Sequence, residues 1–162
     1  MATDARPEAR NTLTPYLAIK GAAGAIEFYK QIFGAVETMR VTGDDGRVGH
    51  CELRIGNSTI FLSDEYPEMN VKGPQTLGGS SLSIYLLVDD ADEVMRKAVA
   101  AGGKVVRPLE DEGDGDRRGT MHDPFGHVWM VATHKRNVSN DEYRRSAATA
   151  GYKVEFPTDG GR

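Results

Sequence analysis

The two halves of this chain repeat the same order of sequence patterns. "YLAIKGAAGAIEFYKQIFGA" (16–35) and "YLLVDDADEVMRKAVAAGGK" (85–104) each read as a strand, a short turn and an amphipathic helix. The segments that follow, "RVGHCELRIGNSTIFLSD" (47–64) and "RRGTMHDPFGHVWMVATH" (117–134), also match. A repeat of about 70 residues, seen only twice, indicates a duplicated module and not a solenoid. Each half is therefore predicted to fold as strand–helix–strand–strand–strand.

Capping residues mark the ends of both predicted helices. Gly34 and Gly102 follow the two apolar helix faces, and glycine commonly ends helices because it adopts the left-handed conformation at low cost. Asp90, with Glu93 three residues on, has the spacing of an N-terminal cap. The predicted buried faces consist of Ile26, Tyr29, Ile32 and Phe33 in the first helix and Val94, Met95, Ala98 and Ala101 in the second.

The polar and glycine-rich stretches suggest where the modules end. The connection over 64–81 is long for one without structure of its own, and such loops often cover binding sites. Ser139 and Glu142 have capping-box spacing before a further helix, which Gly151 would end. We expect a disordered tail over 1–11, one two-module domain over 12–135 (modules about 12–64 and 80–135), a C-terminal helix over 136–152 and a flexible tail over 153–162.

Composition excludes several classes of protein. The net charge of −4 argues against nucleic acid as a partner, since a nucleic-acid-binding chain normally carries a basic stripe. No apolar run is long enough to span a membrane, and the N-terminus lacks the apolar core of a signal peptide. The single cysteine, Cys51, excludes an intrachain disulfide. We therefore expect a cytoplasmic protein with no membrane partner.

Three motifs resemble the vicinal oxygen chelate superfamily, which includes glyoxalase I, extradiol dioxygenases and bleomycin-resistance proteins. They are "AIEFYKQIFGA", "VDDADEVMRKAVAAGGKVV" and "DPFGHVWMVATH", in this order within about 12–135. "GHCELRIGNSTIFLSDE" and "GDRRGTMHDPFGHVWMVATH" are similar to its PhnB-like branch. The resemblance implies an α+β fold of two βαβββ modules in a pseudo-twofold arrangement, each sheet curled around a cavity, here with an added C-terminal helix. It also implies a homodimer whose interface completes the cavities.

The resemblance further implies a metal site in some members, held by four side chains from the first and last strands of each module. Those positions fall here on Thr14, Ser83, Met130 and either Ile60 or Phe61. Hydroxyl and thioether groups are weak ligands compared with imidazole, carboxylate or thiolate. We therefore expect no metal and no other cofactor. In metal-free relatives such a cavity sequesters an organic compound, and we expect a small organic ligand here.

His50, Glu52 and His122 are the weak candidates for catalysis. The alternation of the strand places His50 and Glu52 on the face opposite Cys51. If His122 shares that cavity, the three side chains could hold a relocated metal or act as acid–base groups of a lyase, isomerase or dioxygenase. The alternative is that they are polar wall residues. A third interpretation is a structural or regulatory dimer with a vestigial cavity.

Ligand pockets are normally apolar with a few polar groups. For Arg118 two hypotheses stay open, because it could bind a carboxylate or phosphate or could pair with the acidic loop over 110–116. Asp123 is predicted to be a turn residue of "DPFG", and Trp129 to pack under a helix or at a subunit contact, opposite Met130. The candidate ligand-binding residues are Tyr16, Phe61, Ser83, Tyr85, Arg118 and Met130.

Overall fold

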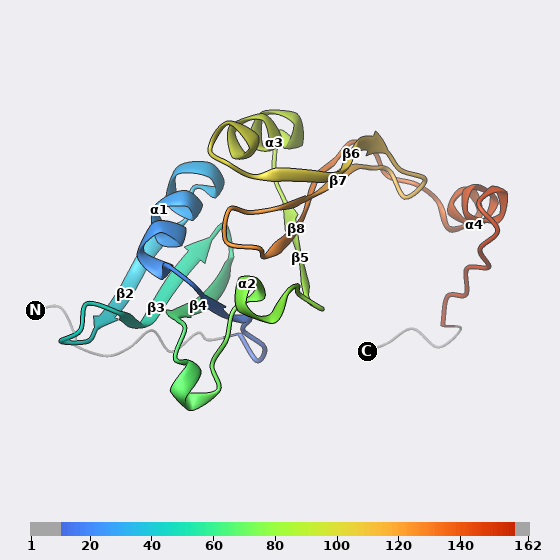
Figure 1. The fold of residues 1–162 in the computed structure, drawn as a ribbon. Coiled ribbons are helices and arrows are strands. Elements are labelled where there is room, and N and C mark those ends of the chain that lie inside the picture. Colours follow the sequence, from blue (N-terminus) through green and yellow to red (C-terminus); the bar gives the residue numbers. More distant parts are fainter. Residues whose placement is uncertain (1–10, 158–162) are drawn as a thin grey trace, which may run out of the picture.

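The computed structural model describes residues 11–157, so most of the predicted N-terminal tail and the last residues of the predicted C-terminal tail lie outside the described range. The chain folds into two four-stranded sheets with helices, an α+β architecture as predicted (Figure 1). Among the described residues, no helix is both long and apolar enough to cross a membrane.

Both modules have the predicted βαβββ order. The strand order of the first sheet is β1-β4-β3-β2, and that of the second is β5-β8-β7-β6, so the two halves have the same topology. In each sheet the first strand lies parallel to the last, and the remaining pairs are antiparallel. Each sheet is open, with two free edges. The first module comprises β1 (Tyr16–Ile19), α1 (Ala22–Phe33), β2 (Val36–Thr42), β3 (Val48–Ile55) and β4 (Ser58–Asp64), and the second β5 (Ser83–Leu87), α3 (Ala91–Ala100), β6 (Lys104–Asp111), β7 (Asp116–His122) and β8 (Val128–His134).

The two module helices end where the sequence predicts. Gly34 adopts a left-handed conformation with φ of 66° and ends α1. The Asp90 side chain caps α3 by accepting a hydrogen bond of 3.0 Å from the Glu93 backbone N–H. The prediction that Ala101 lies on the buried face is wrong, because α3 ends at Ala100 and the chain turns Ala101 toward solvent.

The connection between the modules is more structured than the sequence indicates. It contains a short 3₁₀ helix, η1 (Pro67–Met69), and a short helix, α2 (Pro74–Leu77). Each begins with a proline, whose fixed φ suits the first helical turn. Glu65 donates its backbone N–H to the Ile19 carbonyl at the end of β1 at 3.1 Å, and the Gln75 side chain donates to the Pro124 carbonyl at 3.0 Å. The connection is therefore held against both modules.

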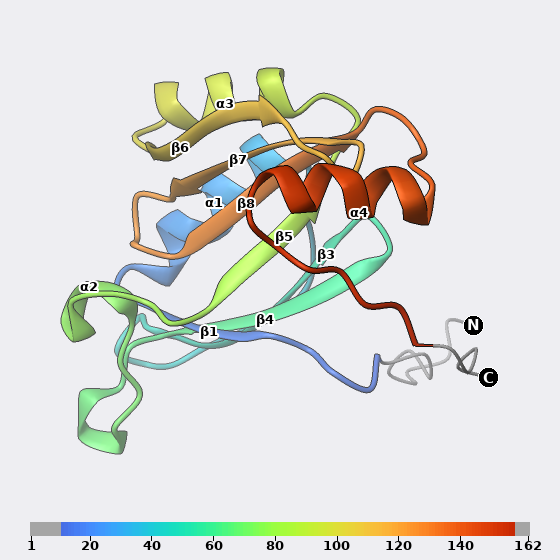
Figure 2. The ribbon, with the colours of Figure 1, turned by 90° about the vertical axis from the view of Figure 1, so that its right-hand side faces the viewer.

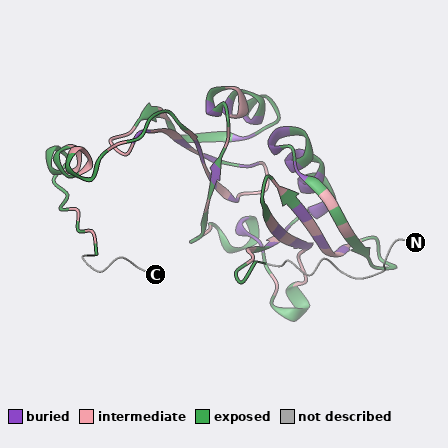
Figure 3. Ribbon diagram, turned by 180° about the vertical axis from the view of Figure 1, so that it is seen from behind, coloured by how far each residue is buried: buried purple, intermediate pink, exposed green. Residues whose placement is uncertain are grey.

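Helix α1 lies between the two sheets. Its apolar face covers the side of the first sheet that carries Cys51 and Leu53. Trp129 of β8 packs against the same helix, with its ring 5.2 Å from that of Tyr29 and 4.5 Å from that of Phe33. Figure 3 shows the buried residues gathered along α1 and the sheet beside it. The other face of each sheet, which we call its open face, therefore points away from α1.

The chain continues from β8 into the predicted C-terminal helix, α4 (Asn140–Thr149). The Ser139 hydroxyl accepts a hydrogen bond of 3.2 Å from the Glu142 backbone N–H, and Gly151 follows the helix with φ of 82°. No residue of α4 is buried. The helix stands beyond the β6–β7 hairpin, on the side of the second sheet's open face (Figures 1 and 2).

Candidate functional site

The open face of the first sheet holds a cluster of aromatic and polar side chains. Tyr16 of β1 pairs with Phe61 of β4, which pairs with Glu52 of β3, so all three share this face. His50 joins them, with Nδ1 at 2.9 Å from Tyr16 Oη and Nε2 at 3.4 Å from Glu52 Oε1. The His50 and Phe61 rings are 5.0 Å apart. Four predicted residues of the first module thus lie together.

The hydrogen bond to Glu52 places one of the hydrogens of the His50 imidazole. The Glu52 carboxylate accepts only, so Nε2 of His50 carries a hydrogen. Nδ1 of a neutral ring then accepts the Tyr16 hydroxyl hydrogen. An imidazole held between a hydroxyl and a carboxylate has the arrangement of a general base with an orienting acid.

The open face of the second sheet holds the other predicted ligand-binding residues. Tyr85 of β5 pairs with Met130 of β8, and Ser83 lies two residues before Tyr85 on the same face. Arg118 of β7 donates to Tyr85 Oη at 3.2 Å and to Asp114 Oδ2 at 2.9 Å, and lies 3.9 Å from Glu112. Arg118 is thus paired with the acidic loop, and its binding of a ligand carboxylate or phosphate stays a prediction.

Within one chain the two groups do not come together. His122 lies at the exposed end of β7, on the open face of the second sheet, whereas His50 and Glu52 lie on that of the first. Over the described range 11–157, no cluster of three or more His, Cys, Asp or Glu side chains could hold a metal ion. The condition under which His50, Glu52 and His122 would converge is therefore not met within a single chain, because the three side chains lie on the open faces of two different sheets.

The strand register decides which residue of the first module occupies the expected metal position. Phe61 pairs with Tyr16 as Met130 pairs with Tyr85, so Phe61 and not Ile60 is the equivalent residue in the first module. Ile60 is buried on the α1 side. The side chains offered are two hydroxyls, a thioether and a phenyl ring, and this donor set does not fit a catalytic divalent ion.

Asp123 joins the modules and lies outside both clusters. Its Oδ1 accepts backbone N–H groups of Phe125 and His127, both at 2.9 Å, which confirms the predicted turn role. Its Oδ2 accepts the Tyr29 hydroxyl at 2.6 Å and the Trp129 indole N–H at 2.9 Å. Burial, reinforced by the Asp123 charge, raises the pKa of Tyr29 well above its usual range. The link to Tyr29 crosses from one module to the other, which no local pattern indicates.

A separate groove of about 450 Å³ lies between the modules. Its walls come from the β3–β4 turn, the free edge of β5, Phe33 and Trp129. Of the predicted ligand-binding residues only Tyr85 borders it. The open faces, and not this groove, therefore carry the candidate site.

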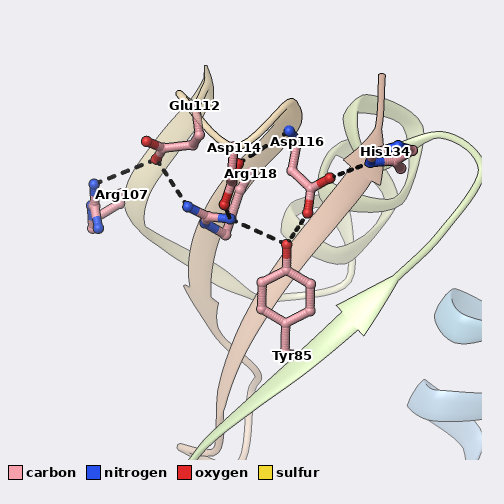
Figure 4. A network of polar contacts seen from close by, with 7 residues as sticks. All are labelled: Tyr85, Arg107, Glu112, Asp114, Asp116, Arg118 and His134. Atoms are coloured by element: carbon pink, nitrogen blue, oxygen red, sulfur yellow. Dashed lines mark hydrogen bonds and ion pairs between the residues drawn. The ribbon is translucent and has the colours of Figure 1, made fainter. Parts of the chain in front are cut away.

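The sequence reasoning missed two polar residues beside Tyr85. Figure 4 shows Asp116 between the Tyr85 hydroxyl and the imidazole of His134. In the sequence, Asp116 belongs only to an acidic run, and His134 is simply the last residue of a strand. Only strand pairing brings them together, since Asp116 lies opposite His134 in the β7–β8 ladder.

The two βαβββ modules agree with the family to which this sequence matches. A family model described as the Glyoxalase/Bleomycin resistance protein/Dioxygenase superfamily matches residues 12–131, and the chain belongs to this superfamily. The uncharacterized protein Mb0911c of Mycobacterium bovis is 42% identical over 142 residues, which cover 86% of this chain and 93% of that protein.

Solved structures share the same fold. The Arabidopsis thaliana protein At5g48480 is 28% identical, with a TM-score of 0.61 over 76% of this chain and 99% of that one. A PhnB protein from Bacillus cereus (21% identical, TM-score 0.61, 76% and 99% covered) and the fosfomycin resistance protein FosX from Listeria monocytogenes (14% identical, TM-score 0.60, 83% and 98% covered) are similar in fold alone.

Proposed function

We propose that this protein binds a small organic molecule without a metal ion, in a cavity that two copies of the chain build together. In this homodimer the open face of the first sheet of one copy lies opposite the open face of the second sheet of its partner. The observation that carries the proposal is the separation of the candidate residues into two groups on outward-facing sheet faces.

The chemistry of the two faces supports this arrangement. Tyr16 is 51% exposed and Tyr85 45% exposed, and Leu87 beside Tyr85 is also exposed. Aromatic and aliphatic walls with a few polar groups are typical of small-molecule pockets, but each wall here lacks an opposite side. Each copy carries one wall of each kind, so a twofold dimer closes two cavities at once.

The donor set at the family's metal positions supports binding without metal. Thr14, Ser83, Met130 and Phe61 offer no imidazole, carboxylate or thiolate. Elemental analysis of purified protein is expected to give no stoichiometric nickel, zinc, iron or manganese. Stoichiometric metal that is lost in His50→Ala or His122→Ala would contradict the proposal.

Ligand binding is tested by thermal shift against a panel of small aromatic and heterocyclic compounds. Compounds that bind the native state raise the melting temperature, and the shift should disappear in Tyr85→Ala and in Tyr16→Ala. Val99→Ala is the matched control, because Val99 is an exposed apolar residue on α3, away from both open faces. A panel without any response would favour a dimer with a vestigial cavity.

A second candidate function is acid–base catalysis by a lyase or isomerase of the same superfamily. The specific observation in its favour is the hydrogen-bond chain from Tyr16 through His50 to Glu52. It predicts that a panel compound is turned over, and that His50→Gln abolishes turnover while the compound still raises the melting temperature. Equal turnover in wild type and His50→Gln would exclude this role.

A further inference from the structure

Tyr85, Asp116 and His134 form a continuous hydrogen-bond chain across three strands. The Tyr85 hydroxyl donates to Asp116 Oδ2 at 2.5 Å, and the other carboxylate oxygen lies 2.8 Å from His134 Nδ1 (Figure 4). Tyr85 is on the open face of β5, whereas His134 is at the end of β8 with 48% of its side chain exposed. These hydrogen bonds therefore connect a candidate ligand-binding residue with a histidine at the surface.

The two acceptor oxygens placed beside the His134 ring favour its charged form. Nδ1 faces a carboxylate oxygen of Asp116, and Nε2 faces Oδ1 of Asn137 at 3.0 Å. Neither oxygen carries a hydrogen, so both contacts are hydrogen bonds only when both ring nitrogens are protonated. The hydrogen bonds to Asp116 and Asn137 raise the pKa of His134, and the Tyr85 hydroxyl followed by the His134 ring lowers that of Asp116.

The charged groups around these hydrogen bonds explain why the proton on His134 matters for Asp116 and Tyr85. Arg118 is neutralised by Asp114 at 2.9 Å and lies 3.9 Å from Glu112, which also lies 3.8 Å from Arg107. The main cation left for Asp116 is His134. With His134 protonated, the three carboxylates face three cations, and loss of its proton leaves one negative charge in excess beside Tyr85. The charged groups facing the chain are Arg107 on β6, Glu112 and Asp114 in the β6–β7 loop, and Asp116 and Arg118 on β7.

We propose that His134 and Asp116 are positioning residues that hold the Tyr85 hydroxyl in a fixed orientation on the ligand wall, and that the charge on His134 tunes the hydrogen bond between Asp116 and Tyr85. The inference rests on the proposed function only in assigning Tyr85 to the ligand wall. The hydrogen bonds from Tyr85 through Asp116 to His134 are present in the protein without ligand and can be measured there.

The proton step is simple to balance. As the pH rises, His134 releases the Nε2 hydrogen to water, because the Nδ1 hydrogen is held by a carboxylate. The Nε2 lone pair then faces the Asn137 oxygen, and that contact is lost. Since folding raises the pKa of His134, its contribution to stability is present below about pH 6.5 and is lost as the pH rises through the higher folded-state value.

The test is a pH titration by NMR of protein labelled with ¹³C at tyrosine Cζ and in the histidine rings. The Tyr85 signal is assigned with Tyr85→Phe. In wild type, the Tyr85 Cζ shift should change with the same midpoint as the His134 ring, above 6.5. In Asp116→Asn the His134 midpoint should fall toward 6.5, because the carboxylate is gone.

Two variants at histidine positions decide the outcome. His134→Asn keeps a donor near Asp116 but cannot titrate, so the change at Tyr85 should vanish. His122→Asn, on the same sheet face but outside the chain of bonds, should leave it unaltered. A Tyr85 signal that stays flat through the His134 titration, or one that still titrates in His134→Asn, would overturn the proposal. Since no ligand is present, either result leaves the proposed cavity untouched, which the thermal-shift panel tests separately.

Discussion

Asp123 is the only carboxylate that is buried among the described residues 11–157. Its side chain is almost fully buried, with 3% exposed, and it accepts four hydrogen bonds. Two come from its own turn, one from Trp129 on the next strand and one from Tyr29 on α1. A buried carboxylate is stable only with such partners, so this residue links turn geometry with the packing of the two modules.

Substitutions of Tyr29 and of Asp123 should lower the free energy of unfolding by different amounts. Tyr29→Phe removes one donor and should lower the free energy of unfolding by about 1–2 kcal/mol. Asp123→Ala leaves several buried donors unpaired and should cost more, about 3 kcal/mol or above. Urea denaturation followed by tryptophan fluorescence measures both. Tyr152→Phe, at an exposed ring, serves as the control, and a loss there equal to that of Tyr29→Phe would contradict the assignment.

At the scale of elements, the connection between the modules departs most from the sequence expectation. The connection packs tightly against the first module and is not an unstructured loop, because the backbone of Gly73 contacts β1. A Cβ at this position would come within 2.5 Å of the Ala18 carbonyl oxygen. The glycine is required by this close approach and not by its dihedral angles, since its φ is −90°.

Gly73→Ala should therefore destabilise the protein by forcing the connection away from β1. Overpacking of this kind costs about 1–3 kcal/mol. Gly79→Ala is the matched control in the same connection, because a Cβ there meets nothing within 4 Å. Thermal melts of the two variants make the comparison. Equal melting temperatures would mean that the connection moves freely.

At the scale of the whole molecule, the position of α1 decides what one chain can bind. This helix packs against the first sheet and against Trp129 of the second, so Tyr16 and Tyr85 lie on the outward faces of two different sheets. The proposed cavity then needs one open face from each of two copies. This arrangement makes a specific prediction about mixed dimers.

Heterodimers of Tyr16→Ala and Tyr85→Ala copies, purified through two different tags, should recover ligand binding. One cavity combines both altered walls, and the other combines two intact walls, so about half of the wild-type sites should return. Isothermal titration with a compound from the panel counts the sites. Heterodimers of Tyr16→Ala and Phe61→Ala should recover none, because both cavities then contain an altered first sheet. No recovery in the first mixture would contradict a shared cavity.

Much of the local structure follows from sequence patterns. Cys51 and Leu53 are buried while His50 and Glu52 face outward, as strand alternation predicts. Gly34, Asp90 and the "DPFG" turn act where their backbone and capping chemistry indicates. Part of the candidate site follows as well, since Tyr16, Phe61, His50 and Glu52 share one face.

The sequence by itself determined the modules, their strands and the face on which each side chain lies, because period, caps and turns act over a few residues. The tertiary structure alone decided that His122 lies apart from His50, that Tyr29 binds Asp123, and that Asp116 links His134 to Tyr85. These relations depend on how α1 packs between the sheets and on strand pairing. Both are fixed by contacts between residues distant in the chain, which no local pattern records.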